Sequence, residues 1–163
     1  MKAAEQLELL REFYREKAAI KARHVAGARL VRNFDFNNSY QYVINREEVQ
    51  LAWLRQAITD LGGSVEDVAE PTLNEGAGDD AQARIITEDR DAAQAFVGRW
   101  RDRVEKMTNA RNRIMLRVIL GETLEHERFF EQALAGRLDL LGRAADGART
   151  AGAVMPTRWV PGR

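Results

Sequence analysis

Apolar residues recur every three or four positions along most of this chain, which is the spacing of one buried face of an α-helix. Four such stretches are separated by polar segments, and none reads as a strand. We therefore predict an all-α protein with four helices, at about residues 2–32, 38–61, 79–107 and 109–142.

Polar residues and glycines mark the expected helix ends. Asn38 and Gln41 have the spacing of a capping box for the second helix, and Asp79 and Gln82 have it for the third. Two glycines at 62–63 follow the second helix, where a left-handed C-terminal cap is common. These signals bound the two middle helices.

The lengths of the connections predict how the helices are arranged. The first and last connections are short, which favours two antiparallel hairpins. The middle connection, residues 62–78, reaches on the order of 55 Å when extended, whereas a helix of about 24 residues is only about 36 Å long. It can therefore cross the whole bundle and leave the second and third helices parallel. We predict a four-helix bundle with one long crossover over residues 1–142, followed by an extended C-terminal tail, residues 143–163.

Composition narrows the class of protein. The chain of 163 residues has 25 basic and 25 acidic side chains, so its net charge favours neither a nucleic-acid nor a membrane partner. It has no cysteine, which excludes disulfides, iron–sulfur clusters and thiolate zinc sites. No apolar run approaches the roughly 20 residues of a membrane span. We expect a soluble cytoplasmic protein, and long amphipathic helices with exposed tyrosines favour a homodimer.

Two ionisable residues interrupt the apolar stripes. Glu47 lies on the stripe of the second helix and His126 on that of the fourth. A buried carboxylate or imidazole must be paired, neutral or bound to an ion, because an isolated buried charge is costly. With the crossover topology, Asp89 of the third helix falls at the level of Glu47, and reflection through the turns places both His126 and His24 near that level. In a helical bundle such a layer predicts a metal site between the helices.

Residues 45–54 (NREEVQLAWL) and 121–130 (GETLEHERFF) resemble the second and fourth helices of the ferritin-like superfamily, which includes bacterioferritins and rubrerythrins. That family holds two irons with one Glu on each of two helices and a Glu-x-x-His pair on each of the other two. The resemblance covers residues 2–142 in helix order and crossover. It implies metal-binding positions at Glu16 or His24 on the first helix, Glu47 and Gln50 on the second, Asp89 on the third, and Glu122 and His126 on the fourth.

The resemblance implies a metal-binding protein that oxidises ferrous iron or consumes peroxide at one or two iron ions, or at manganese in their place. Two positions depart from the family pattern. Gln50 stands where a histidine is expected, and its neutral oxygen is a poor iron ligand. Thr123 stands where a glutamate is expected. The remaining ligands suit one metal better than two, and the alternative is a metal-free helical scaffold or interaction protein of the same fold.

Structural roles are the alternative for the individual residues. Glu47 could pair with an arginine such as Arg99 or Arg103. His126 could be a core histidine that hydrogen-bonds to Glu122 or Asp89.

The C-terminal tail has an Ala/Gly/Arg-rich connector followed by a short apolar segment that contains Met155, Trp159 and Val160. Such a segment is typical of a docking peptide. We expect it to fold back on its own bundle or to bind a neighbouring subunit or another protein.

Overall fold

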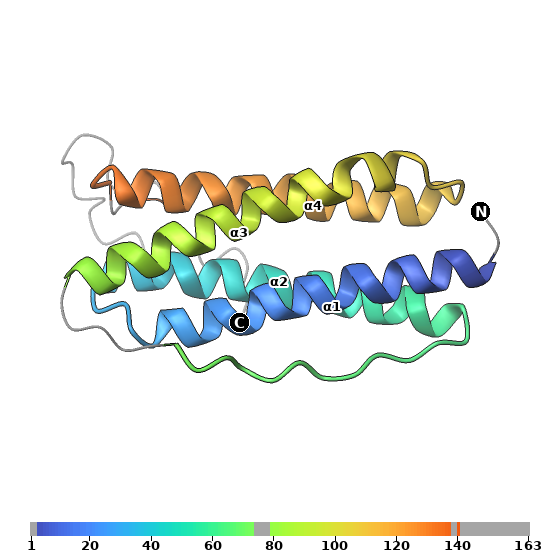
Figure 1. Cartoon of the computed structure of the whole chain (residues 1–163), viewed down its shortest axis with the longest axis horizontal. Helices are drawn as coiled ribbons and strands as arrows, with labels where there is room; N and C mark the ends of the chain where they lie inside the picture. The colour runs from blue at the N-terminus through green and yellow to red at the C-terminus, as the bar shows by residue number, and fades with distance from the viewer. Residues whose placement is uncertain (1–2, 74–78, 138–139, 141–163) are drawn as a thin grey trace, which may run out of the picture.

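The computed structural model describes residues 3–73, 79–137 and 140. These residues form an all-α four-helix bundle, as predicted (Figure 1). Within them, no helix is long and apolar enough to span a membrane. The predicted tail, residues 143–163, lies outside the described part of the chain. The helices are α1 (Ala3–Ala28), α2 (Phe34–Asp60), α3 (Asp79–Glu105) and α4 (Ala110–Leu134).

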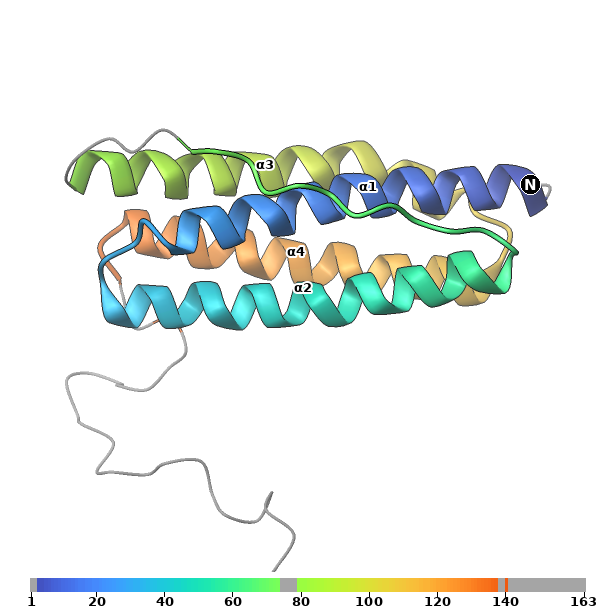
Figure 2. The same ribbon diagram turned by 90° about the horizontal axis from the view of Figure 1, so that it is seen from below.

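The predicted crossover is confirmed. α1 and α2 form one antiparallel hairpin, α3 and α4 form the other, and α2 and α3 run in the same direction (Figures 1 and 2). After α2, residues 61–73 return along the bundle beside α1 (Figure 2). Arg11, in the first half of α1, donates a hydrogen bond to the backbone oxygen of Ser64 (3.2 Å). Arg29, just beyond the far end of α1, pairs with Glu70 (2.7 Å), so the crossover is tied to the bundle at two separate heights.

The turn between α1 and α2 differs from the prediction. α1 ends at Ala28, about one turn earlier than expected. α2 begins at Phe34 because Asn33, not Asn38, is its N-cap. The side-chain oxygen of Asn33 accepts a hydrogen bond from the backbone N–H of Phe36 (2.9 Å), which satisfies one of the free donors at the start of the helix.

The other helix ends agree in part. α4 ends at Leu134, about two turns earlier than predicted, and Gly136 follows with a φ of 88°, the left-handed conformation that often terminates a helix. α3 begins at Asp79, as predicted. Gln82, which was expected to close its capping box, instead accepts a hydrogen bond from the backbone N–H of Arg32 (3.3 Å).

The apolar core falls into two clusters along the bundle. One is centred on the rings of Phe13, Phe96 and Trp100, and the other on Phe36, Tyr40 and Phe130. Between the two apolar clusters and along their edges, the inward positions of each helix carry buried polar side chains. These are Lys17 and His24 on α1, Glu47 and Gln50 on α2, Asp89 on α3, and Thr123 and His126 on α4.

Candidate functional site

The centre of this polar layer is a buried ion pair between α1 and α2. Lys17 and Glu47 are both fully buried, and the Lys17 Nζ donates a hydrogen bond to the Glu47 Oε1 over 2.8 Å. The same Nζ donates to the Thr123 Oγ1 of α4 over 3.2 Å. Thr123 in turn donates to the backbone oxygen of Ile119 (2.8 Å). A single ammonium therefore links three of the four helices at mid-height.

His24 completes the neutralisation of Glu47. Its Nδ1 lies 2.9 Å from the second carboxylate oxygen, Oε2. Burial raises the pKa of Glu47, but attraction to His24 and Lys17 outweighs it and lowers that pKa to about 2. Burial lowers the pKa of His24, but the adjacent Glu47 charge outweighs this effect and the net shift is upward. Both oxygens of the carboxylate are thus occupied by donors from α1.

His126 lies in the same layer but is not paired. Its side chain is buried, and neither ring nitrogen has a hydrogen-bond partner in the described part of the chain. Burial, and then repulsion from Lys17, lower the pKa of His126 to about 3, so the ring is neutral at pH 7. The Nε2 of His24 and the Oε1 of Gln50 are also buried without a partner among these residues.

Asp89 of α3 does not bind to this ion pair. Its partners are Arg23 of α1 and Tyr40 near the start of α2. Its carboxylate accepts hydrogen bonds from the Arg23 Nε (2.7 Å) and from the Tyr40 hydroxyl (2.5 Å). Burial and the Asp89 charge raise the pKa of Tyr40 well above its usual value, so the hydroxyl remains a donor. Arg23, at the bundle edge, supplies the positive charge that neutralises Asp89.

Replacement of Tyr40 by phenylalanine should lower the free energy of unfolding by about 1.5–3 kcal/mol, because it removes a hydrogen bond to a buried charged group. Urea denaturation would measure the change. Tyr42→Phe is the matched control, since Tyr42 is partly exposed on the outside of α2. Equal effects of the two substitutions would contradict a structural role of the Tyr40 hydroxyl.

The remaining predicted carboxylates are neutralised at the edges of the bundle. Glu16 accepts from Arg99 (2.7 Å) and from the Trp100 indole (3.1 Å). Glu122 accepts from Arg46 (2.5 Å) and from Gln50 Nε2 (2.5 Å) across the seam between α2 and α4.

The structure thus brings only part of the predicted ligand set together. Glu47 and His24 are in contact, and His126 lies close enough that their charges affect its pKa. Glu16, Asp89 and Glu122 are each neutralised elsewhere by an arginine. Within the described residues, no group of three or more His, Asp or Glu side chains is arranged to hold a metal ion.

A metal does not fit this arrangement of donors. The ammonium of Lys17 already occupies the space beside Glu47 where a cation would bind, and it would repel a second cation. Among the described residues, Glu47 is the one carboxylate hydrogen-bonded to Lys17 or His24, whereas an iron site needs several anionic ligands. Lys17 supplies the positive charge beside Glu47 that the predicted ligand pattern assigned to a metal ion.

The alternative partners predicted for Glu47 and His126 are also wrong. Arg99 and Arg103 do not pair with Glu47; they pair with Glu16 and with Glu12. His126 makes no hydrogen bond to Glu122 or Asp89 in the described structure.

Lys17 was not predicted as a site residue, because the first helix was expected to contribute Glu16 or His24. The signal was present, since Lys17 is four residues after Phe13 and three before Ile20, on the inward stripe of α1. Its place on that stripe matches those of Glu47 and His126 on theirs.

Comparison of this chain with protein-family models, curated proteins and solved structures gives no match. The resemblance to the ferritin-like superfamily therefore stays a prediction from the sequence.

Proposed function

We propose that this chain is a metal-independent helical scaffold that acts through its surface as an interaction protein. The observation that carries the proposal is the hydrogen bond of Lys17 to Glu47 and Thr123 in the middle of the bundle. In this position the Lys17 ammonium neutralises the Glu47 carboxylate, as a bound metal ion would. It holds α1, α2 and α4 together, and arginines neutralise the other predicted carboxylates, Glu16, Asp89 and Glu122.

The outer surface supports the interaction role. Most of the exposed large hydrophobic side chains lie on one side of the bundle, over α2 and α4. Exposed apolar side chains that gather on one face of a folded domain commonly mark a binding surface. The charge cluster then has a structural role, because it fixes the register of the helices that carry this surface.

A metal-binding protein that oxidises iron or consumes peroxide is the second candidate. One observation favours it: among the described residues the His24 Nε2 and both ring nitrogens of His126 have no hydrogen-bond partner, and imidazole nitrogens bind iron or manganese. Metal binding there would require Lys17 to leave Glu47.

Titration with Fe²⁺ in the absence of oxygen, and with Mn²⁺ and Zn²⁺, tests the choice. A site filled at 100 times its dissociation constant would stabilise the fold by about 2.7 kcal/mol. We expect no metal-dependent rise in the unfolding temperature of the wild-type protein. The Lys17→Glu variant should gain binding, because a carboxylate then joins Glu47 and the two histidines. Lys21→Glu, one turn further along α1 and nearer the surface, introduces the same charge as a control.

Retention of one or two iron ions per wild-type chain, lost in Glu47→Ala, would overturn the scaffold proposal and support the metalloprotein. The same substitution leaves Lys17 unpaired, so metal content must be compared under conditions where both proteins are folded.

A further inference from the structure

The exposed apolar side chains gather on one face of the bundle. Of the seven large hydrophobic residues that are exposed in the described structure, five lie on the outer side of α2 and α4. The other two, Phe34 and Val68, lie at the start of α2 and in the crossover. The five that share this face, which we name the α2/α4 face, are Tyr42 (37% exposed), Val49 (40%), Trp53 (39%), Ile114 (58%) and Val118 (43%).

The spacing along this face is that of helices that pack on further helices. The outward positions of α2 alternate in steps of four and three, as do the facing positions of α4, the repeat of a coiled-coil seam. Gly121 has open space where a side chain would project, so another helix could approach α4 closely there. The positions are 42, 46, 49, 53, 56 and 60 on α2, and 111, 114, 118, 121 and 125 on α4.

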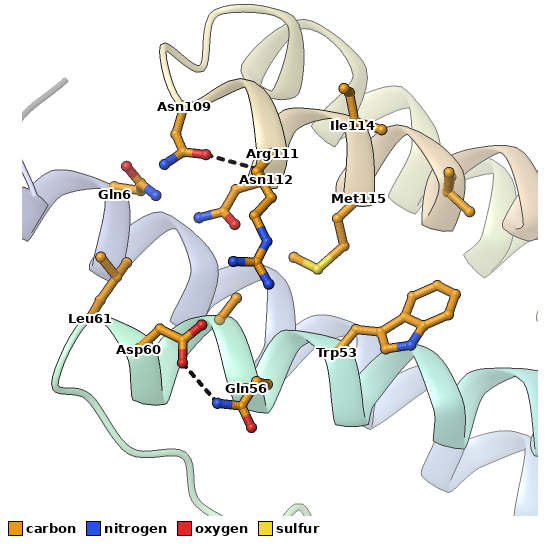
Figure 3. A pocket seen from close by; sticks show the side chains of 12 residues that line it. Gln6, Trp53, Gln56, Asp60, Leu61, Asn109, Arg111, Asn112, Ile114 and Met115 are labelled. Atoms are coloured by element: carbon orange, nitrogen blue, oxygen red, sulfur yellow. Dashed lines mark hydrogen bonds between the residues drawn. The ribbon is translucent and has the colours of Figure 1, made fainter.

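A groove of about 470 Å³ opens between the end of α2 and the start of α4. Figure 3 shows Trp53 on its α2 side and Ile114 and Met115 on its α4 side. Arg111 extends from α4 toward α2, near the end of the groove where the Gln56 Nε2 donates a hydrogen bond to Asp60 (Figure 3). The groove is apolar along its middle and carries both signs of charge at its end.

The charges of the α2/α4 face have a self-complementary order. Near the start of α2 the face carries Arg46 on α2, which pairs with Glu122 of the same chain, and Glu125 on α4. At its other end the signs are exchanged, with Asp60 on α2 and Arg111 on α4. Among these four residues, no like charges therefore meet when the face packs against itself about a two-fold axis along or across the helices.

Two orientations of the two-fold axis in the plane of the face satisfy this order. An axis along the helices places α2 over α4 of the second copy, so that Asp60 faces Arg111 of the partner subunit and Trp53 lies over Val118 of the partner subunit. An axis across the helices places each helix antiparallel to its own copy, so that Arg46 faces Asp60 of the partner subunit. An isologous contact of this kind is the commonest way in which identical chains assemble.

We propose that the α2/α4 face binds a second copy of this chain and forms a two-fold homodimer. The inference deepens the proposed function by naming the partner of the interaction surface. The groove beside Trp53 receives apolar side chains of the second copy, and the charges at both ends of the face set the register.

Sedimentation velocity of the full chain, from low micromolar to several hundred micromolar concentration, tests this proposal. We expect the wild-type protein to form a dimer. Val118→Glu should raise the dimer dissociation constant by roughly 30-fold or more, because it places an unpaired charge in the centre of the interface. Val68→Glu is the matched control, since Val68 has similar exposure but lies in the crossover. Thermal unfolding of each variant establishes that it is folded.

A wild-type chain that stays monomeric at the highest concentration would overturn the proposal, and so would a dimer that Val118→Glu leaves unchanged. Shielding of Trp53 from a soluble quencher in a monomer would assign the face to the chain's own C-terminal segment and would also overturn it. The metal titration above is independent: iron binding by a dimer would refute the scaffold proposal alone, and a metal-free monomer would refute the dimer alone.

Discussion

Replacement of Lys17 by methionine should lower the free energy of unfolding by about 3–5 kcal/mol, because it leaves the Glu47 charge buried without the ammonium that is hydrogen-bonded to it. Methionine has nearly the shape of lysine, so lost packing contributes little. His24 alone would then face the carboxylate, and Thr123 would lose the donor that now reaches it. Equilibrium denaturation with guanidinium measures the difference.

The double variant Lys17→Met with Glu47→Gln separates charge from packing. It removes both charges and keeps a hydrogen-bonding group next to His24, so it should recover most of the stability that the single variants lose. Lys21→Met is the control, because the Lys21–Glu48 pair lies at the surface and contributes little. If the two lysine variants lose equal stability, the buried pair does not hold the bundle together.

Acid should unfold this protein well before its surface carboxylates are fully protonated, because His126 is neutral in the fold. The pKa of His126 falls from its usual 6.5 to about 3 in the folded state. The unfolded chain therefore binds one more proton than the folded chain between these values, and stability declines as pH falls through this window. Full protonation would remove roughly 4–5 kcal/mol at 1.36 kcal/mol per pH unit.

Two neighbouring groups shape the same profile. The pKa of Glu47 is lowered to about 2, so its contribution is present above its usual value of 4.5 and is lost as pH falls below that. The pKa of His24 is raised, so its contribution is complete below 6.5 and is lost as pH rises through its folded pKa. Stability should therefore be greatest near neutral pH.

His126→Leu separates the effect of His126 from the other two. The free energy of unfolding of this variant, measured at a series of pH values, should change much less between pH 6.5 and 4 than that of the wild-type protein. A wild-type profile that is flat over this window would mean that His126 is protonated, or paired, in the fold.

The sequence was sufficient for the fold because helices and connection lengths leave local signals. The stripe of α2 and the long crossover between α2 and α3 both follow from spacing alone, and both are observed. Helix ends were harder to place: Asn33 and Asn38 are equally good caps by residue type, and only packing chose between them.

The site was harder to predict because charge balance is a property of the assembled layer. Glu47 and His126 could be recognised as inward from their spacing, but the cation that neutralises Glu47 comes from another helix. The spacing along a single helix does not show which group neutralises Glu47. The predicted partner was therefore a metal ion or an arginine, and not Lys17. The pairing of Glu16 with Arg99, and of Asp89 with Arg23, likewise depends on rotations of the helices that spacing does not fix.

The most direct test of the internal cation is nitrogen NMR of the Lys17 side chain, assigned by comparison with Lys17→Met. We expect an ammonium signal with slowly exchanging protons, from a group hydrogen-bonded to the Glu47 carboxylate and unchanged by excess Zn²⁺. A Lys17 ammonium that exchanges rapidly with water, or that is displaced from Glu47 when Zn²⁺ is added, would contradict it.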